Sequence, residues 1–329
     1  MPDDWDFSTK RRPQTQLPII TYGLCALCVI LTLIYLNAPE GSSLARVKPI
    51  IAPSPEQIWD GAYFGLLTTF FAHGGPVHLI FNMMWLVQLG REMEAVLSPI
   101  EYFLFLAVSA FVSMGCELAV IGHGGIGASG VVYAMFGLMW VGKAKYPSWS
   151  AVANRQNLNV FLIWGVACIF TTITKIMPVA NVAHFSGLLF GMAVGWLWLA
   201  PRRKMIWAIP ASLLAILAVL SLFWLPWSAE WYHYKAAKAF RSKNYPMAIS
   251  NYHRSLRLGG DRYYNWENIK RAWINLAIDA DDRNDVAARE FAEHQAASAE
   301  RLEGPDPEKE PEKPAVPTMP SLSRRPKGQ

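Results

Sequence analysis

Long apolar segments recur between residues 17 and 225 of this 329-residue chain, and they constrain its fold more than any other feature. Seven segments can be drawn as membrane spans, at 17–36, 77–97, 102–122, 127–141, 158–176, 181–199 and 205–225. Within lipid the backbone N–H and C=O groups of such a segment must be satisfied internally, which favours helices. The sequence therefore predicts an all-α polytopic membrane protein over residues 17–225.

Positive charge is unevenly distributed between the segments that connect these spans. One set of connections carries Lys10, Arg11, Arg12, Arg91, Lys143, Lys145, Arg155, Arg202, Arg203 and Lys204. The other set carries only Arg46, Lys48 and Lys175. Because Lys and Arg concentrate in cytoplasmic loops, we predict a cytoplasmic N-terminal segment at 1–16 and, after seven spans, a non-cytoplasmic C-terminus. With no signal peptide or organelle presequence visible, we expect a multi-pass protein of the cell (inner) membrane.

Two polar residues that can react together lie inside the apolar region. Ser129 stands in Gly127-Ala128-Ser129-Gly130 at the start of the fourth span, and His184 stands at the start of the sixth. The predicted topology places both near the non-cytoplasmic ends of their spans. A hydroxyl or imidazole buried in lipid needs a partner, and a serine beside a histidine is the arrangement of a nucleophile and its base. We therefore predict that Ser129 and His184 are a catalytic pair.

The fourth span is too short to cross a bilayer. From 127 to 141 a helix rises about 22 Å at 1.5 Å per residue, against roughly 30 Å of hydrocarbon. The glycine-rich residues 122–127 before it predict irregular backbone at membrane depth, which is tolerated only where protein or a water-filled cavity satisfies it. We expect Ser129 to lie below the membrane surface in a hydrated cavity.

Three further side chains fit this pair. His78 and Asn82 share one face of the second span and can donate hydrogen bonds without carrying a negative charge, which suits an oxyanion. The alternative is that they only tie helices together in lipid. Tyr133 lies one turn after Ser129 and is predicted either to stack on His184 or to be a core aromatic.

We expect His73 to order the first loop through Glu94.

Glycine spacing predicts how the fourth and sixth spans meet. Gly187, Gly191 and Gly195 repeat every four residues after His184, and Gly130 and Gly137 offer a matching face on the fourth span. Small residues at this spacing let two helix backbones approach closely. Close approach is what a serine–histidine hydrogen bond of about 2.6–3.2 Å requires.

These motifs resemble the rhomboid family of intramembrane serine proteases. The matching stretches are residues 73–82, 127–133 and 183–187 with Gly191, and the resemblance covers about 60–200. It implies a rhomboid-like bundle of six helices plus one C-terminal span. It also implies a dyad of Ser129 and His184, an oxyanion hole of His78, Asn82 and the Ser129 N–H, and Tyr133 packed on His184. The implied substrates are single-pass transmembrane proteins in the bilayer, cleaved without metal or cofactor.

The chain changes from apolar to polar and charged after residue 225, which marks a domain boundary. Apolar side chains then recur at helical spacing at Tyr232, Ala236, Tyr245, Ala248, Ile249 and Tyr252. The pattern resembles one tetratricopeptide-type helical hairpin, and a second amphipathic stretch follows at 266–301. We predict a small soluble α-helical domain at 227–303 and a disordered, Pro-rich charged tail at 304–329.

Several functional alternatives are open. The helical extension is either a solubilising appendage or a docking module for a substrate or partner protein. The main alternative to a protease is a catalytically inactive rhomboid-like protein that binds membrane helices, and intact Ser129, His184, His78 and Asn82 argue against it. A transporter would need an inverted repeat or a charged relay, and neither is evident. Nothing in the sequence points to a nucleic-acid partner.

Overall fold

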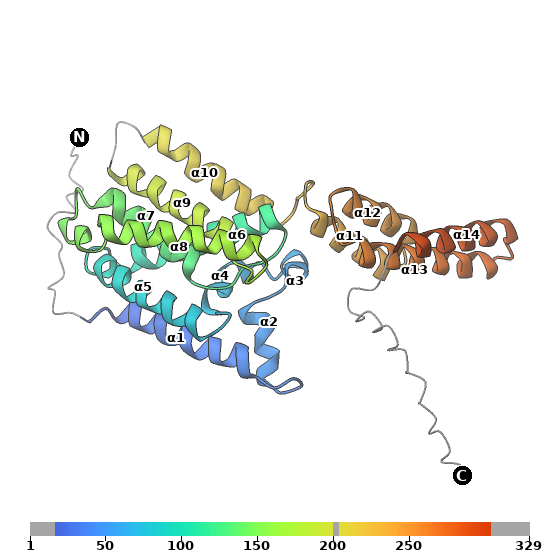
Figure 1. Cartoon of the computed structure of the whole chain (residues 1–329), viewed down its shortest axis with the longest axis horizontal. Coiled ribbons are helices and arrows are strands. Elements are labelled where there is room, and N and C mark those ends of the chain that lie inside the picture. The colour runs from blue at the N-terminus through green and yellow to red at the C-terminus, as the bar shows by residue number, and fades with distance from the viewer. Residues whose placement is uncertain (1–16, 200–203, 304–329) are drawn as a thin grey trace, which may run out of the picture. The chain divides into compact units, whose positions relative to one another are not determined.

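The structure, a computed structural model, describes residues 17–199 and 204–303. Within these ranges every regular element is a helix, which confirms the predicted all-α fold (Figure 1). The chain divides into two compact units after Trp231. The predicted cytoplasmic segment at 1–16, the basic residues Arg202 and Arg203, and the predicted tail at 304–329 lie outside the described residues.

Seven helices correspond to the seven predicted spans. They are α1 (Ile19–Asn37), α5 (Pro76–Glu94), α6 (Pro99–Ile121), α7 (Ser129–Gly142), α8 (Arg155–Ile173), α9 (Asn181–Leu199) and α10 (Lys204–Leu220). Among the described residues, α1, α6 and α8 are long and apolar enough to cross a membrane. Helix α7 has 14 residues, so it rises about 21 Å and is shorter than a bilayer core.

The connection between α1 and α5 is built from short helical turns. These are η2 (Leu44–Val47), α2 (Lys48–Ile51), α3 (Pro55–Trp59), α4 (Gly65–Thr68) and η3 (Thr69–Phe71). Helix α3 begins with a capping box, in which Ser54 and Gln57 exchange side-chain to backbone hydrogen bonds. A local capping box therefore fixes the start of α3, in a loop that has no long apolar run.

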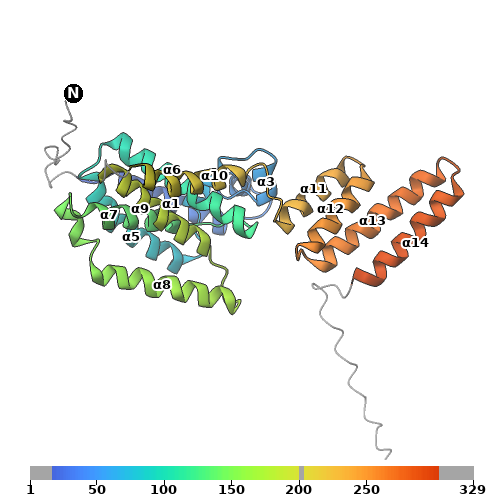
Figure 2. The same cartoon turned by 90° about the horizontal axis from the view of Figure 1, so that it is seen from above.

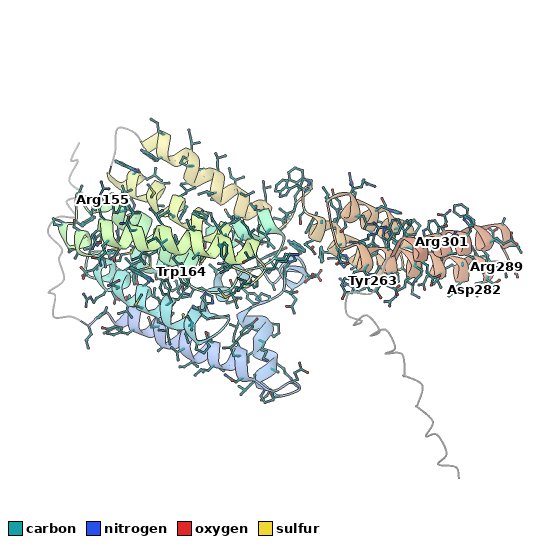
Figure 3. All side chains as sticks on the ribbon, in the orientation of Figure 1. Arg155, Trp164, Tyr263, Asp282, Arg289 and Arg301 are labelled. Carbon is teal, nitrogen blue, oxygen red and sulfur yellow. The ribbon has the colours of Figure 1, made fainter. Side chains whose placement is uncertain are left out.

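The first of the two compact units, which ends at Trp231, is called the membrane unit below, and helix α7 lies at its centre. Almost all of its residues are buried, and its longest interface is with α9. Helix α8 (coloured light green) runs along one edge of the bundle in Figure 2. It contacts α5 through aromatic rings: Trp164, labelled in Figure 3, stacks on Phe81 with ring centroids 4.5 Å apart. A buried α7 beside α9 provides the position for the predicted pair.

A buried carboxylate joins the start of α1 to the end of α5. Glu94 accepts hydrogen bonds from the Ile20 N–H at 3.0 Å, the Thr21 N–H at 2.9 Å and the Thr21 hydroxyl at 2.8 Å. The two N–H groups belong to the first turn of α1, where a helix cannot satisfy its own amides. The expected pairing of Glu94 with His73 is wrong, because Glu94 binds the first turn of α1, whereas His73 binds Thr32 further along α1 and the Ala128 N–H.

The segment that follows α10 is held against the end of α6 and against α3. The Trp227 indole N–H donates to the Ala119 carbonyl at the end of α6 at 2.7 Å. The buried Trp59 donates to the Ser221 carbonyl at 2.9 Å and meets the Trp231 ring edge-on at 5.2 Å between centroids. His123 lies 3.9 Å from the Glu230 carboxylate. Residues 221–231 are therefore part of the membrane unit.

The C-terminal unit is a pair of helical hairpins. It contains most of α11 (Ala229–Arg241), then α12 (Tyr245–Arg257), α13 (Arg262–Asp281) and α14 (Val286–Glu303). Lys243, Gly259 and Asn284 adopt left-handed φ angles at the three turns, where helices commonly end. Alanine, tyrosine and isoleucine side chains from all four helices share one core. Arg289, labelled in Figure 3, pairs with Asp281 at 2.9 Å across the last turn. The tetratricopeptide resemblance stays a prediction.

Candidate active site

Ser129 and His184 are in direct hydrogen-bond contact. Ser129 is the first residue of α7, His184 lies in the first turn of α9, and 2.7 Å separates Ser129 Oγ from His184 Nε2. The imidazole is 3% exposed, whereas the serine is half-buried. This distance lies within the range expected of a nucleophile and its base. A hydroxyl that is reachable and an imidazole that is enclosed fit those two roles.

The His184 ring is fixed by stacking and not by a carboxylate. The Tyr133 ring lies 4.7 Å from it between centroids at an interplanar angle of 8°. The Tyr133 hydroxyl donates to the Phe161 carbonyl of α8 at 3.0 Å, which restrains the tyrosine. Nδ1 of His184 is buried and has no hydrogen-bond partner among the described residues. The arrangement lacks the third member of a serine protease triad.

Glycines allow the two helices to approach closely enough for this contact. A Cβ added to Gly187 would overlap the Gly130 carbonyl, and one added to Gly191 would overlap the Ala134 carbonyl. From the other side, a Cβ on Gly137 would overlap the Leu188 carbonyl. The glycines singled out in the sequence therefore lie at the α7–α9 interface, with Gly187 and Gly130 beside the pair.

The backbone that precedes Ser129 is held in a conformation that requires glycine. Gly127 has a φ of +117°, which L side chains rarely adopt, and its N–H donates to the Thr69 carbonyl at 2.9 Å. A Cβ at this position would lie 2.8 Å from the His78 ring. The Ala128 N–H donates to His73 Nε2 at 3.3 Å. These contacts set where α7 begins.

His73 holds that backbone as a neutral imidazole. Burial, reinforced by the neighbouring His78, lowers the pKa of His73 to about 3. Because Nε2 accepts from Ala128, Nδ1 carries the proton and donates to the Thr32 hydroxyl of α1 at 3.2 Å. Thr32 in turn donates to the Phe71 carbonyl at 3.0 Å. His73 therefore links α1 to the residue before Ser129, a role that sequence reasoning missed.

His78 and Asn82 lie one turn apart on α5, beside the start of α7. His78 Nδ1 accepts from the Gly74 N–H at 3.2 Å, so the proton is on Nε2, on the edge of the ring that faces Gly127. The Asn82 amide donates one hydrogen to the His78 carbonyl at 2.8 Å and keeps a second. The His78 ring thus lies against Gly127, two residues before Ser129, and the first-turn amides of α7 are further donors that a helix leaves unsatisfied.

Comparison with known proteins agrees with this architecture. A family model described as "Rhomboid domain" matches residues 56–201, which include α5 to α9. Rhomboid protease GlpG of Photorhabdus laumondii is 34% identical over 143 residues, 43% of this chain and 48% of the relative. The proteins of the same name from Yersinia pseudotuberculosis (strain IP32953) and Yersinia pestis (strain Pestoides F) are 26% identical over 191 residues, 58% of this chain and 66% of each relative. The chain thus spans about half to just under two thirds of the length of these relatives. Residues 56–201 of this chain are therefore similar to the rhomboid domain and to these rhomboid proteases.

Proposed function

We propose that this protein is an intramembrane serine endopeptidase that cleaves transmembrane segments of membrane proteins near the non-cytoplasmic face. The observation that carries the proposal is the 2.7 Å contact between Ser129 Oγ and His184 Nε2 at the starts of two packed helices, α7 and α9. The rhomboid proteases among its relatives support the same reaction class.

The dyad performs acyl transfer in two halves. As Ser129 Oγ bonds to the scissile carbonyl carbon, His184 Nε2 takes the hydroxyl proton. When the C–N bond breaks, the same nitrogen returns that proton to the leaving amine, leaving an acyl-serine. A water molecule, deprotonated by His184, then attacks the ester, and the proton returns to Ser129 Oγ as the acid product leaves.

The oxyanion that forms in each half is stabilised by donors from two helices. His78 Nε2–H, the second Asn82 amide hydrogen and the Ser129 N–H are the proposed set. Removing one donor of this kind in a serine protease costs about 10²–10³ in rate. The positive end of the α7 dipole favours negative charge at the same place.

The proposed orientation follows from the ends of α7. Ser129 begins this helix, and Lys143 follows its last turn, with Arg155 opening α8 shortly afterwards. Lys and Arg concentrate in cytoplasmic loops, so these basic residues are proposed to face the cytoplasm. Ser129 then faces the opposite side of the inner membrane. The N-terminus is then cytoplasmic, and the C-terminal helical unit is non-cytoplasmic.

The proposed substrates are single-pass membrane proteins. A helical peptide bond is shielded by its own hydrogen bonds, so a substrate must unwind locally to present a carbonyl to Ser129. Small or helix-breaking residues near the non-cytoplasmic surface lower that cost. Residues 232–303 are proposed as a docking unit for a substrate or partner protein.

The proposal is tested with the full-length protein in liposomes. We expect the wild type to cut a model single-pass substrate within its membrane segment, near the end that faces the Ser129 side, with the bond identified by mass spectrometry. Ser129→Ala should leave the substrate intact. Equal cleavage by both proteins would reject the dyad, and binding without cleavage by either would favour the inactive helix-binding alternative.

The stacking of Tyr133 on His184 leads to a separate prediction. Tyr133→Phe keeps the ring and loses only the bond to the Phe161 carbonyl, so we expect cleavage within a few-fold of wild type. Tyr133→Ala frees the imidazole, and a misplacement of about 1 Å costs about 10²-fold in rate. Turnover measured at saturating substrate checks this, and equal rates for both variants would contradict it.

A further inference from the structure

Glu117 is a buried acid on α6 that the chemistry described above does not use. Glu117 is 5% exposed and lies in the last turns of α6, among apolar neighbours. Burying a carboxyl group in such surroundings is costly unless it is hydrogen-bonded. The partner of Glu117 therefore indicates why an acid stands at this position.

That partner is the first turn of the helix that carries His184. Glu117 Oε2 accepts the Ala183 N–H at 2.9 Å, and Ala183 directly precedes His184. Ala180 precedes α9, and its carbonyl accepts the His184 N–H at 3.3 Å. Ala180 thus occupies the N-cap position, where a side-chain oxygen normally satisfies an amide of the first turn, but its own side chain is a methyl group. Glu117 provides the missing acceptor from another helix.

The same face of α6 also contacts the start of α7. A Cβ on Gly130 would lie 2.6 Å from the Ser113 hydroxyl, so Ser113 packs directly on the residue after Ser129. Ser113 lies one turn before Glu117 on α6. A Cβ on Gly125, in the loop before α7, would lie 2.7 Å from Ala180 and 3.8 Å from Glu117. Helix α6 therefore holds the beginnings of both helices that carry the dyad.

We infer that Glu117 is a positioning residue for His184, acting by capping α9 through the Ala183 amide. In a serine protease triad a carboxylate orients the imidazole through its Nδ1–H. Here Nδ1 of His184 has no such partner among the described residues, and Glu117 fixes the backbone turn from which the imidazole extends. This inference rests on the proposed function, since it assigns the cap a catalytic consequence.

Three substitutions in the full-length protein test the capping role. Glu117→Gln keeps an acceptor oxygen and should retain kcat within about tenfold. Glu117→Leu removes the acceptor and should lower kcat by about 10²-fold, as a displaced catalytic group does, with KM changed less than threefold. Glu117→Asp keeps the charge but is one methylene shorter, so it should lie between them. Glu101→Gln, on the same helix, is the matched control, because Gln also completes the capping box there.

Hydrogen exchange separates this inference from the proposed function. In Glu117→Leu the amides of residues 181–186 should exchange faster, while those of α1 keep their wild-type rates. Wild-type kcat in the Leu variant, a purely KM effect, or unchanged exchange at the start of α9 would overturn the capping role. If Leu does not fold, the Gln and Asp variants decide by the same readouts. A wild-type protein that cleaves nothing would overturn the proposed function, while exchange would still report the cap.

Discussion

Ser129→Ala is expected to reduce substrate cleavage by about 10⁶-fold in kcat, to a residual rate set by binding and oxyanion stabilisation alone. The reason is that no other hydroxyl is placed to attack with His184 as its base at 2.7 Å in the part of the chain that the structure describes. His184→Ala should lose about as much, because an unassisted serine is a poor nucleophile. The double variant should be no slower than either single variant, since the two groups act as a unit.

The matched control for this experiment is Ser109→Ala on α6. Ser109 is fully buried and its hydroxyl has no hydrogen-bond partner among the described residues. Removing a hydroxyl that makes no bond is expected to be neutral or stabilising. Initial rates in liposomes, at equal amounts of folded protein, provide the comparison. A double variant markedly slower than both single variants would mean that Ser129 and His184 act independently.

Gly191→Ala is expected to impair catalysis without touching the reacting groups. The added methyl group would overlap the Ala134 carbonyl, a backbone atom that cannot move aside as a side chain does. The α7–α9 pair must then separate, and overpacking of this kind costs about 1–3 kcal/mol of stability. Because a shift of about 1 Å in a reacting group costs about 10²-fold in rate, we expect a loss of that size in kcat.

Gly165→Ala on α8 is the control for the glycine experiment. Its Cβ would lie 3.6 Å from the Tyr133 hydroxyl and 3.7 Å from Phe185, which are ordinary contact distances. We expect wild-type turnover and a melting temperature that is equal or slightly higher, because alanine favours helix over glycine. Similar losses in both variants would show that turnover depends on glycine flexibility and not on helix spacing.

The helices and the contact between Ser129 and His184 could be predicted from the sequence because each has a local signature. Apolar runs locate the helices within a few residues. The span drawn at 158–176 is α8 at Arg155–Ile173, and the earlier start follows from Asn154, whose side chain accepts the Asn157 N–H. The phase of Gly187 and Gly191 relative to His184 indicates which helix faces which.

The supporting residues could not be predicted in the same way because their partners are backbone amides. Glu117 accepts from Ala183, and His73 accepts from Ala128. A backbone N–H has no signature in a sequence. These hydrogen bonds can be identified only when α6 is placed beside α9 and His73 beside the start of α7. The short helices of the first loop have no apolar period to indicate how they fold, and the capping box of Ser54 and Gln57 is seen only in the structure.

The anchoring of residues 221–231 has a practical consequence for anyone who shortens this chain. A fragment that stops at Leu220 would lose the indole that caps the Ala119 carbonyl and the carbonyl that Trp59 binds. It would also uncover Gly122, whose neighbours are Ser228 and Glu230, in the loop that leads to Ser129. The expression boundary for an isolated membrane unit therefore belongs inside α11, beyond Trp231.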